Sequence, residues 1–155
     1  MNRYFMAIYA GLGAALAIGA LALAEHRLSD LALLMAPFGA TAVLVFGLPE
    51  SPLAHAKNVI VGHLITAAIG VAVSALMGVT PLSLGLASGL AVSAMLITRT
   101  THPPAGANPI LIMLSGQSWG FLLFPVLLGT TAIVLCGRIM QLLKTTGYNT
   151  RETGG

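Results

Sequence analysis

The sequence predicts an all-α membrane protein, a polytopic bundle of transmembrane helices. Of its 155 residues, 57% are hydrophobic and 7% are charged, whereas about 25% of residues are charged in an average soluble domain. Apolar runs recur along the whole chain, several of them long enough to cross a bilayer as a helix. The alternation of polar and apolar residues typical of a transmembrane barrel is absent. We expect one transmembrane domain over residues 1–145 and a polar C-terminal tail over 146–155.

The first apolar run, Tyr4–Ala24, has two interpretations. Arg3 before it and the small residues near its end resemble a signal peptide with a cleavage site. The run is longer than the apolar region of a usual signal peptide, and its glycines and alanines have the spacing of helix-packing residues. These features favour a retained transmembrane helix.

The rest of the chain divides into apolar segments separated by polar or proline-bearing links. The expected helical segments are Leu31–Leu48, Asn58–Met77, Leu82–Thr98, Pro103–Leu114 and Phe121–Leu143. The expected links are Glu25–Asp30, Pro49–Lys57, Thr80-Pro81, Arg99–His102 and Ser115–Gly120. Pro37 and Gly39 break the first of these helical segments, and Pro109 breaks the fourth.

An internal repeat relates the two halves of the chain. A shift of 67 residues without a gap aligns 37–70 with 104–137 and gives eight identities, including the two Pro-x-Gly-Ala breaks and two later pairs of glycines. The preceding helices align at a shift of 74 residues. Chance matching of Gly-, Ala- and Leu-rich helices is the alternative explanation. We favour a true repeat of helix, broken half-helix and helix, over about 4–78 and 82–143.

The positive charges indicate how the repeats cross the membrane. If both broken segments cross, there are six spans, and every Lys and Arg except Arg27 lies on one side. If the segments only re-enter, there are four spans and the charges divide four against three. The positive-inside rule favours six spans with both termini in the cytoplasm, which makes the repeats inverted, as in many transporters.

The second break begins with His102-Pro103-Pro104 and is suited to holding an anion. Pro104 fits the first position of a helix, so the N–H groups that follow it are expected to be free donors at the positive helix end. The first break repeats this pattern, with the Thr41 hydroxyl at the position of the Asn108 amide. The candidate anion-binding residues are Phe38, Gly39, Ala40, Thr41, His102, Pro103, Pro104, Ala105, Gly106, Ala107 and Asn108.

Helix ends alone are too weak to hold a desolvated anion. Each is worth at most about 2 kcal/mol, whereas stripping the water from a small ion costs several kcal/mol. Thr41, Asn108 and a protonated His102 would therefore have to contribute, and a histidine that titrates near neutral pH can couple proton movement to the anion. The alternative for His102 is an ordinary buried histidine that caps a helix or binds a carbonyl.

Three further residues are candidates for the lining of a pore. Asn58 and His63 lie on the long second helix, where His63 has the alternative role of a polar contact between helices. Arg99 is a topology anchor that can also attract anions to the mouth.

Composition predicts neither a metal site nor a cofactor. The single cysteine, Cys136, permits no disulfide framework, and the methionines form no cluster. The net charge of +3 is explained by membrane topology and indicates no nucleic-acid partner. The chain has neither a His-Glu-x-x-His motif nor a Ser-His-acid pattern, so we expect no enzyme.

Over about residues 31–140 the chain resembles the HPP family of membrane proteins, named for the His-Pro-Pro motif. The segments that carry the resemblance are Ala36–Ala42, Ser51–Ala54, Lys57-Asn58, Gly62-His63 and His102–Ala107. Asn108-Pro109 stands where the family pattern has Thr or Ala after Gly-Ala. The family includes proteins implicated in nitrite transport, and the resemblance implies that activity here. Because no plastid transit peptide precedes Met1, we expect a bacterial inner membrane.

The leading hypothesis is a carrier or channel for a small monovalent anion, nitrite first, bound near the midplane between the two breaks. The alternative is a non-transporting scaffold or oligomeric partner, which predicts an apolar cleft at the motifs. An intramembrane enzyme is the weakest hypothesis. The expected partners are the anion, the lipid bilayer and further copies of the same chain.

Overall fold

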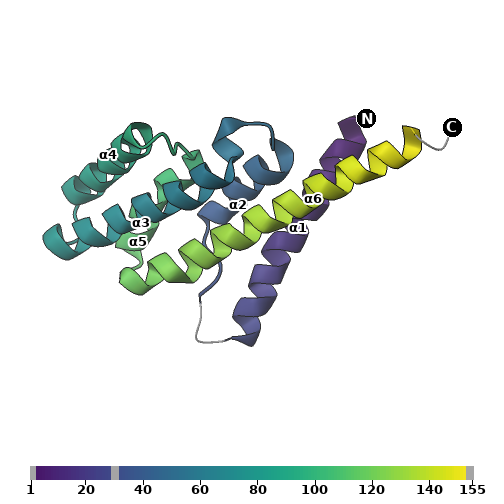
Figure 1. Cartoon of the computed structure of the whole chain (residues 1–155). Coiled ribbons are helices and arrows are strands. Elements are labelled where there is room, and N and C mark those ends of the chain that lie inside the picture. The colour runs from purple at the N-terminus through teal and green to yellow at the C-terminus, as the bar shows by residue number, and fades with distance from the viewer. Residues whose placement is uncertain (1–2, 29–31, 153–155) are drawn as a thin grey trace.

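The chain folds as an all-α bundle (Figure 1). The computed structural model describes residues 3–28 and 32–152, and these residues contain no strand. The α-helices are α1 (Arg3–Arg27), α2 (Pro37–Ala42), α3 (Ala56–Met77), α4 (Pro81–Ile97), α5 (Asn108–Leu114) and α6 (Leu128–Glu152). The short elements are two π-helices, η1 (Val43–Gly47) and η5 (Leu123–Leu127), and three 3-10 helices, η2 (Pro52–Ala54), η3 (Pro103–Ala107) and η4 (Trp119–Leu122).

Three helical segments are long and apolar enough to span a membrane: Arg3–Arg27, Ala56–Met77 and Trp119–Lys144. The predicted membrane helical bundle is confirmed. Helix α4 has 17 residues, or about 26 Å, and the broken segments are shorter still. Six crossings, the cytoplasmic termini and the inverted orientation of the repeats stay predictions.

The packing follows the 67-residue repeat. A Cβ built on Gly62 of α3 would lie 2.8 Å from the Thr100 carbonyl oxygen, and one on Gly129 of α6 would lie 3.2 Å from the Leu33 carbonyl oxygen. Residues 62 and 129 are repeat mates, and so are residues 33 and 100. The two contacts therefore correspond under the 67-residue shift, and each long helix packs against the segment that precedes the break of the other half.

A second pair of glycines shows the same kind of contact between the two halves of the chain. Gly70 of α3 faces Pro109 and Ile112 of α5, and Gly137 of α6 faces Val45 of η1, the repeat mate of Ile112. Each glycine sits where a Cβ would collide, so these positions let α3 and α6 approach the broken segments closely. Helix α1 lies across α6 (Figure 1), where the Tyr9 hydroxyl donates to the Met140 carbonyl over 2.7 Å.

Three segments differ from the prediction. Glu25, His26 and Arg27 belong to the last turns of α1 and not to a loop, because basic residues stabilise a helix C-terminus and the Glu25 carboxylate has partners farther along the chain. The Leu33 and Leu34 N–H groups donate to Glu25 Oε2 over 2.6 and 2.7 Å.

The second break, expected as a short segment interrupted at Pro109, changes its helix type one residue earlier. It forms the 3-10 helix η3 followed by α5. Pro109 has no N–H to close an α-helical bond to Ala105, so the α-helix begins at Asn108, with Pro109 in its first turn where no donor is needed. The expected segment Leu31–Leu48 is also shorter in the structure, because residues 32–36 are not helical and α2 begins at Pro37. Helix α4 agrees, since it begins after a Thr80–Ser83 capping box, as expected from Thr80-Pro81.

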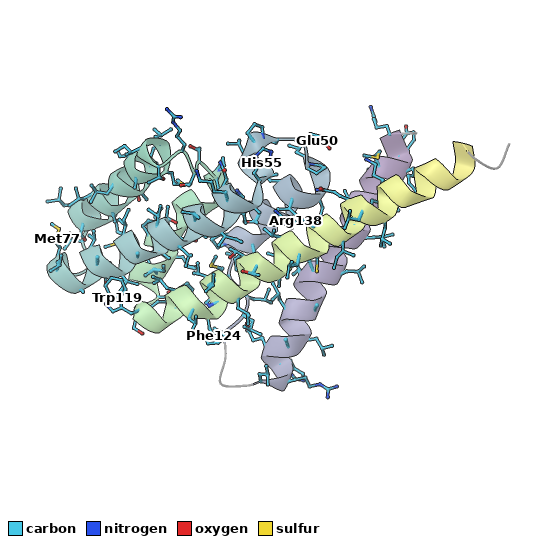
Figure 2. All side chains as sticks on the ribbon, viewed as in Figure 1. Glu50, His55, Met77, Trp119, Phe124 and Arg138 are labelled. Atoms are coloured by element: carbon cyan, nitrogen blue, oxygen red, sulfur yellow. The ribbon has the colours of Figure 1, made fainter. Side chains whose placement is uncertain are left out.

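The ends of the bundle carry the polar links. Figure 2 places His55 and Glu50 beside the start of α3, and Met77 at its far end with Trp119 on the same side of the molecule. Trp119 is exposed, as an aromatic residue at a membrane interface should be. The buried core between these ends is apolar and is built from residues such as Phe38, Val59, Ile112, Val126 and Ile133.

Candidate functional site

A cluster of four polar side chains lies inside this apolar core. Thr41 comes from α2, His63 from α3, His102 from the link before η3, and Asn108 from the start of α5. All four are 0% exposed. We call these residues the polar cluster. Three of them were predicted site residues and His63 was a pore-lining candidate, so the fold brings together side chains from both breaks.

The Thr41 hydroxyl is the centre of the polar cluster. Its Oγ1 lies 2.9 Å from His63 Nε2 and 3.0 Å from His102 Nε2. It also lies 3.2 Å from the carbonyl oxygen of Pro37, one turn earlier in α2. The two imidazole rings meet edge to face with their centroids 5.0 Å apart. One hydroxyl therefore links both histidines to the first residue of α2.

Asn108 completes the polar cluster on the far side of His63. Its Nδ2 lies 2.9 Å from His63 Nδ1 and donates over 3.0 Å to both the His63 carbonyl and Thr66 Oγ1. Thr66 is a buried member of this network that sequence reasoning missed. Its position three residues after His63, on the same helix face, is the signal that could have found it.

The outer end of the polar cluster is a main-chain group. His102 Nδ1 lies 2.7 Å from the Leu53 carbonyl oxygen, which is half-buried in the link between η1 and α3. A carbonyl only accepts, so Nδ1 carries a hydrogen. His102 thus makes the carbonyl contact that was its alternative role, in addition to its contact with Thr41.

The histidines break the symmetry of the repeat. Thr41 and Asn108 are repeat mates, as expected, and both contact His63. The repeat mate of His63 is Thr130, whose hydroxyl donates to the carbonyl of Val126, in the preceding turn of η5, over 2.6 Å. The repeat mate of His102 is Met35. Both titratable groups of the polar cluster therefore have non-titratable mates.

A groove runs between the two broken segments, beside the polar cluster. Its volume is about 630 Å³. The lining residues are apolar apart from one serine at the edge: Ala36, Pro37, Ala40, Pro103, Pro104, Ala107, Ile110, Leu111, Leu114 and Ser115. Ala40 and Ala107 are the chain neighbours of Thr41 and Asn108. The groove thus has the apolar walls that the scaffold alternative predicts, with polar side chains buried next to them.

The prediction of free N–H groups at the starts of both breaks is wrong for three of these groups. Gly39 N–H donates to the Ala36 carbonyl over 3.2 Å, and Ala105 N–H donates to the His102 carbonyl over 3.0 Å. The Asn108 N–H donates to the Ala105 carbonyl. Turns precede both breaks, so these donors are already bonded and a bare helix end is absent at Gly39, Ala105 and Asn108.

The other predicted residues surround the polar cluster or lie outside it. Phe38 is buried with its ring edge-on to His63, at a centroid distance of 5.8 Å. Gly39 is exposed and Gly106 half-buried. Asn58 Nδ2 donates to the Thr101 carbonyl over 2.9 Å, which ties α3 to the link before His102. Arg99 is exposed at the end of α4, with a φ of 52°, and the fold does not bring it into the polar cluster.

No charged side chain among the described residues hydrogen-bonds to either imidazole. The described residues also contain no group of His, Cys, Asp and Glu side chains that could hold a metal ion. No charged side chain of the described residues is thus bonded to the two rings, and a positive charge on them comes from proton uptake.

The family model for the HPP transmembrane region matches residues 2–149. The chain belongs to the HPP family. A transmembrane protein of Dictyostelium discoideum is 35% identical to this HPP chain over 132 residues, covering 78% of the chain and 42% of the relative. A second one is 31% identical over 121 residues, covering 73% and 42%. The chain thus matches under half the length of these relatives. No solved structure matches it.

Proposed function

We propose that this HPP protein moves a small monovalent anion, nitrite first, across a membrane together with a proton. The observation that carries the proposal is the polar cluster, completely buried between the two halves of a membrane bundle. Polar and ionisable side chains inside a membrane are costly and generally mark a transport pathway or a ligand site. The choice of nitrite rests on the resemblance to HPP proteins implicated in nitrite transport.

Because no charged side chain of the described residues is bonded to the two rings, a proton has to accompany the anion. Removing water from a small ion costs several kcal/mol even after the protein relaxes. A hydrogen bond to a charged group returns about 1.5–3 kcal/mol, so three such bonds return about 4.5–9 kcal/mol. Thr41, Asn108 and a protonated His102 can supply these bonds if they turn from one another toward the anion. Such a site would be modest and reversible, as transport requires.

The groove is the proposed route to this site. Ala40 and Ala107 line it, and the side chains of their chain neighbours Thr41 and Asn108 lie in the polar cluster. A small displacement of α2 from η3 would open the polar cluster to the groove. The corrected site therefore consists of buried side chains behind the groove, with the helix ends in a secondary role.

Nitrite uptake into proteoliposomes under an inward proton gradient tests the proposal. We expect His102→Gln and Thr41→Val to reduce uptake at least tenfold, because the first removes the group that takes up the proton and the second removes a hydroxyl donor at the centre of the site. Thr130→Val is the matched control, since it removes a buried hydroxyl outside the polar cluster. Wild-type rates in both variants, or equal losses in all three, would rule out the site.

A non-transporting scaffold is the second candidate, favoured by the apolar walls of the groove. It predicts self-association without nitrite flux in pure lipid vesicles, whereas the transporter predicts flux. We propose no enzymatic role, since neither histidine hydrogen-bonds to a carboxylate among the described residues. Residence in a bacterial inner membrane and assembly as a homo-oligomer remain parts of the proposal.

A further inference from the structure

One arrangement of hydrogens gives both rings of the neutral polar cluster a partner at every nitrogen. His102 Nδ1 must donate to the Leu53 carbonyl, so His102 Nε2 is a lone pair that needs a donor. Thr41 is the group in reach, and its hydroxyl donates there over 3.0 Å. His63 Nε2 must then donate to Thr41 Oγ1, and His63 Nδ1 accepts from the Asn108 amide over 2.9 Å.

Adding one proton at His102 disturbs this arrangement least. When the polar cluster opens to the groove, the lone pair of His102 Nε2 forms a new N–H bond with a proton taken from water, and this N–H donates to Thr41 Oγ1. The Thr41 hydroxyl hydrogen rotates away to the Pro37 carbonyl, 3.2 Å distant. Thr41 Oγ1 then accepts from both rings and donates to Pro37, so every group has a partner with the heavy atoms in the positions that they have in the closed structure.

Adding the proton at His63 instead creates a conflict. A hydrogen on His63 Nδ1 would point at Asn108 Nδ2, 2.9 Å away, which itself carries hydrogens. The other acceptor on that side, Asn108 Oδ1, is farther, at 3.3 Å. The Asn108 amide cannot simply reverse, because its oxygen would then lie about where Nδ2 is now, 3.0 Å from the His63 carbonyl oxygen, which only accepts. Asn108 thus holds His63 in one neutral form.

We infer that the polar cluster takes up a single proton, that His102 holds it, and that His63 stays neutral as a positioning residue fixed by Asn108. The inference rests on the proposed function for its role in transport, whereas its chemistry can be measured without an anion. A second proton is opposed, because two charged rings would lie with centroids 5.0 Å apart. The polar cluster therefore has two states that differ by one proton, and the Thr41 hydroxyl donates to His102 Nε2 in the neutral state and to the Pro37 carbonyl in the protonated state.

Among the described residues, no other titratable side chain hydrogen-bonds to either ring. The elements packed on the two rings contribute Thr41 and the Pro37 carbonyl from α2, the Leu53 carbonyl from η2, Thr66 from α3 and Asn108 from α5. The charged residues nearest in sequence are Lys57 and Arg99, and both are exposed. The Thr41 hydroxyl donates to the Pro37 carbonyl when His102 is protonated, and Pro37 lines the groove. One hydroxyl therefore connects the protonation of His102 to a residue of the groove wall.

Solid-state NMR of the full chain in lipid vesicles, with histidine labelled at both ring nitrogens, tests the inference. At high pH we expect His102 to carry its hydrogen on Nδ1 and His63 on Nε2. On acidification only His102 should gain a second N–H, while His63 keeps its form. His63→Gln and His102→Gln assign the two signals by their loss.

Asn108→Asp is the decisive variant, because a carboxylate accepts from His63 Nδ1 instead of donating to it. We expect this change to move the added proton from His102 to His63, while Thr130→Val leaves both spectra as in the wild type. A second N–H on wild-type His63, on both rings together, or a hydrogen on Nε2 of neutral His102 would overturn the inference. The wild-type titration decides the matter even if Asn108→Asp fails to fold. Loss of nitrite flux alone leaves the inference intact.

Discussion

Thr41→Val should destabilise the protein through two buried nitrogens that lose their partner. Valine keeps the shape of threonine but has no hydroxyl, so His63 Nε2 and His102 Nε2 each lose the contact with Thr41 Oγ1 at 2.9 and 3.0 Å. Both rings are completely buried, so water cannot replace the hydroxyl without opening the core.

The expected decrease in the free energy of unfolding follows from the hydrogen bond that each ring nitrogen loses. A buried group left unpaired costs about 1–3 kcal/mol, whereas hydrogen bonds between transmembrane helices average about 0.6 kcal/mol and reach about 1.7 kcal/mol. Because α2, α3 and the link before η3 meet here inside a membrane bundle, we use the lower range for two bonds. Thr41→Val should therefore lower the free energy of unfolding by about 1–3 kcal/mol.

Reversible unfolding in detergent micelles measures this loss against a matched control. Thr130→Val also replaces a buried threonine, but the Thr130 hydroxyl bonds only to carbonyls of its own segment. Those carbonyls keep their helical partners, so the control should lose less than about 1 kcal/mol. Thr41→Ser retains the hydroxyl and should fall between the two valine variants. Equal losses for both valine variants would refute the central position of Thr41.

Two further variants test the packing and the entry to the first break. Gly62→Ala should lower the free energy of unfolding by about 1–3 kcal/mol through overpacking, because the new Cβ would lie 2.8 Å from the Thr100 carbonyl oxygen. Gly89→Ala on α4 is the control, since its Cβ meets open space. Equal melting temperatures of the two variants would contradict the close approach. Glu25→Gln should cost about 1–2 kcal/mol by weakening two charge-assisted bonds, and exposed Glu50→Gln should have no effect on the melting temperature.

The repeat allowed much of the site to be predicted from the sequence. Aligning the two Pro-x-Gly-Ala breaks made Thr41 and Asn108 equivalent, and the fold places both against one histidine. The same alignment paired Gly62 with Gly129, and both lie against main-chain carbonyls of the opposite half. Patterns of small residues and prolines were informative because they act through backbone geometry, which a repeated sequence preserves.

The bonding partners within the site could not be predicted from the sequence. His63 and His102 lie on different elements, and their contact depends on how α3 is rotated against η3. The Leu53 carbonyl is a main-chain group, so no residue type marks it. The expected free donor at Ala105 is bonded because the turn begins at His102, before the prolines. Proline patterns indicate where an α-helix can begin but not which turns precede it.

Proton movement driven by nitrite measures the central claim most directly. Vesicles that contain the wild-type protein and a trapped pH dye are given external nitrite at equal internal and external pH. We expect acidification inside the vesicles that accompanies nitrite entry with one proton per anion, and its loss in His102→Gln. Nitrite entry without protein-dependent acidification, or the same acidification in His102→Gln, would contradict it.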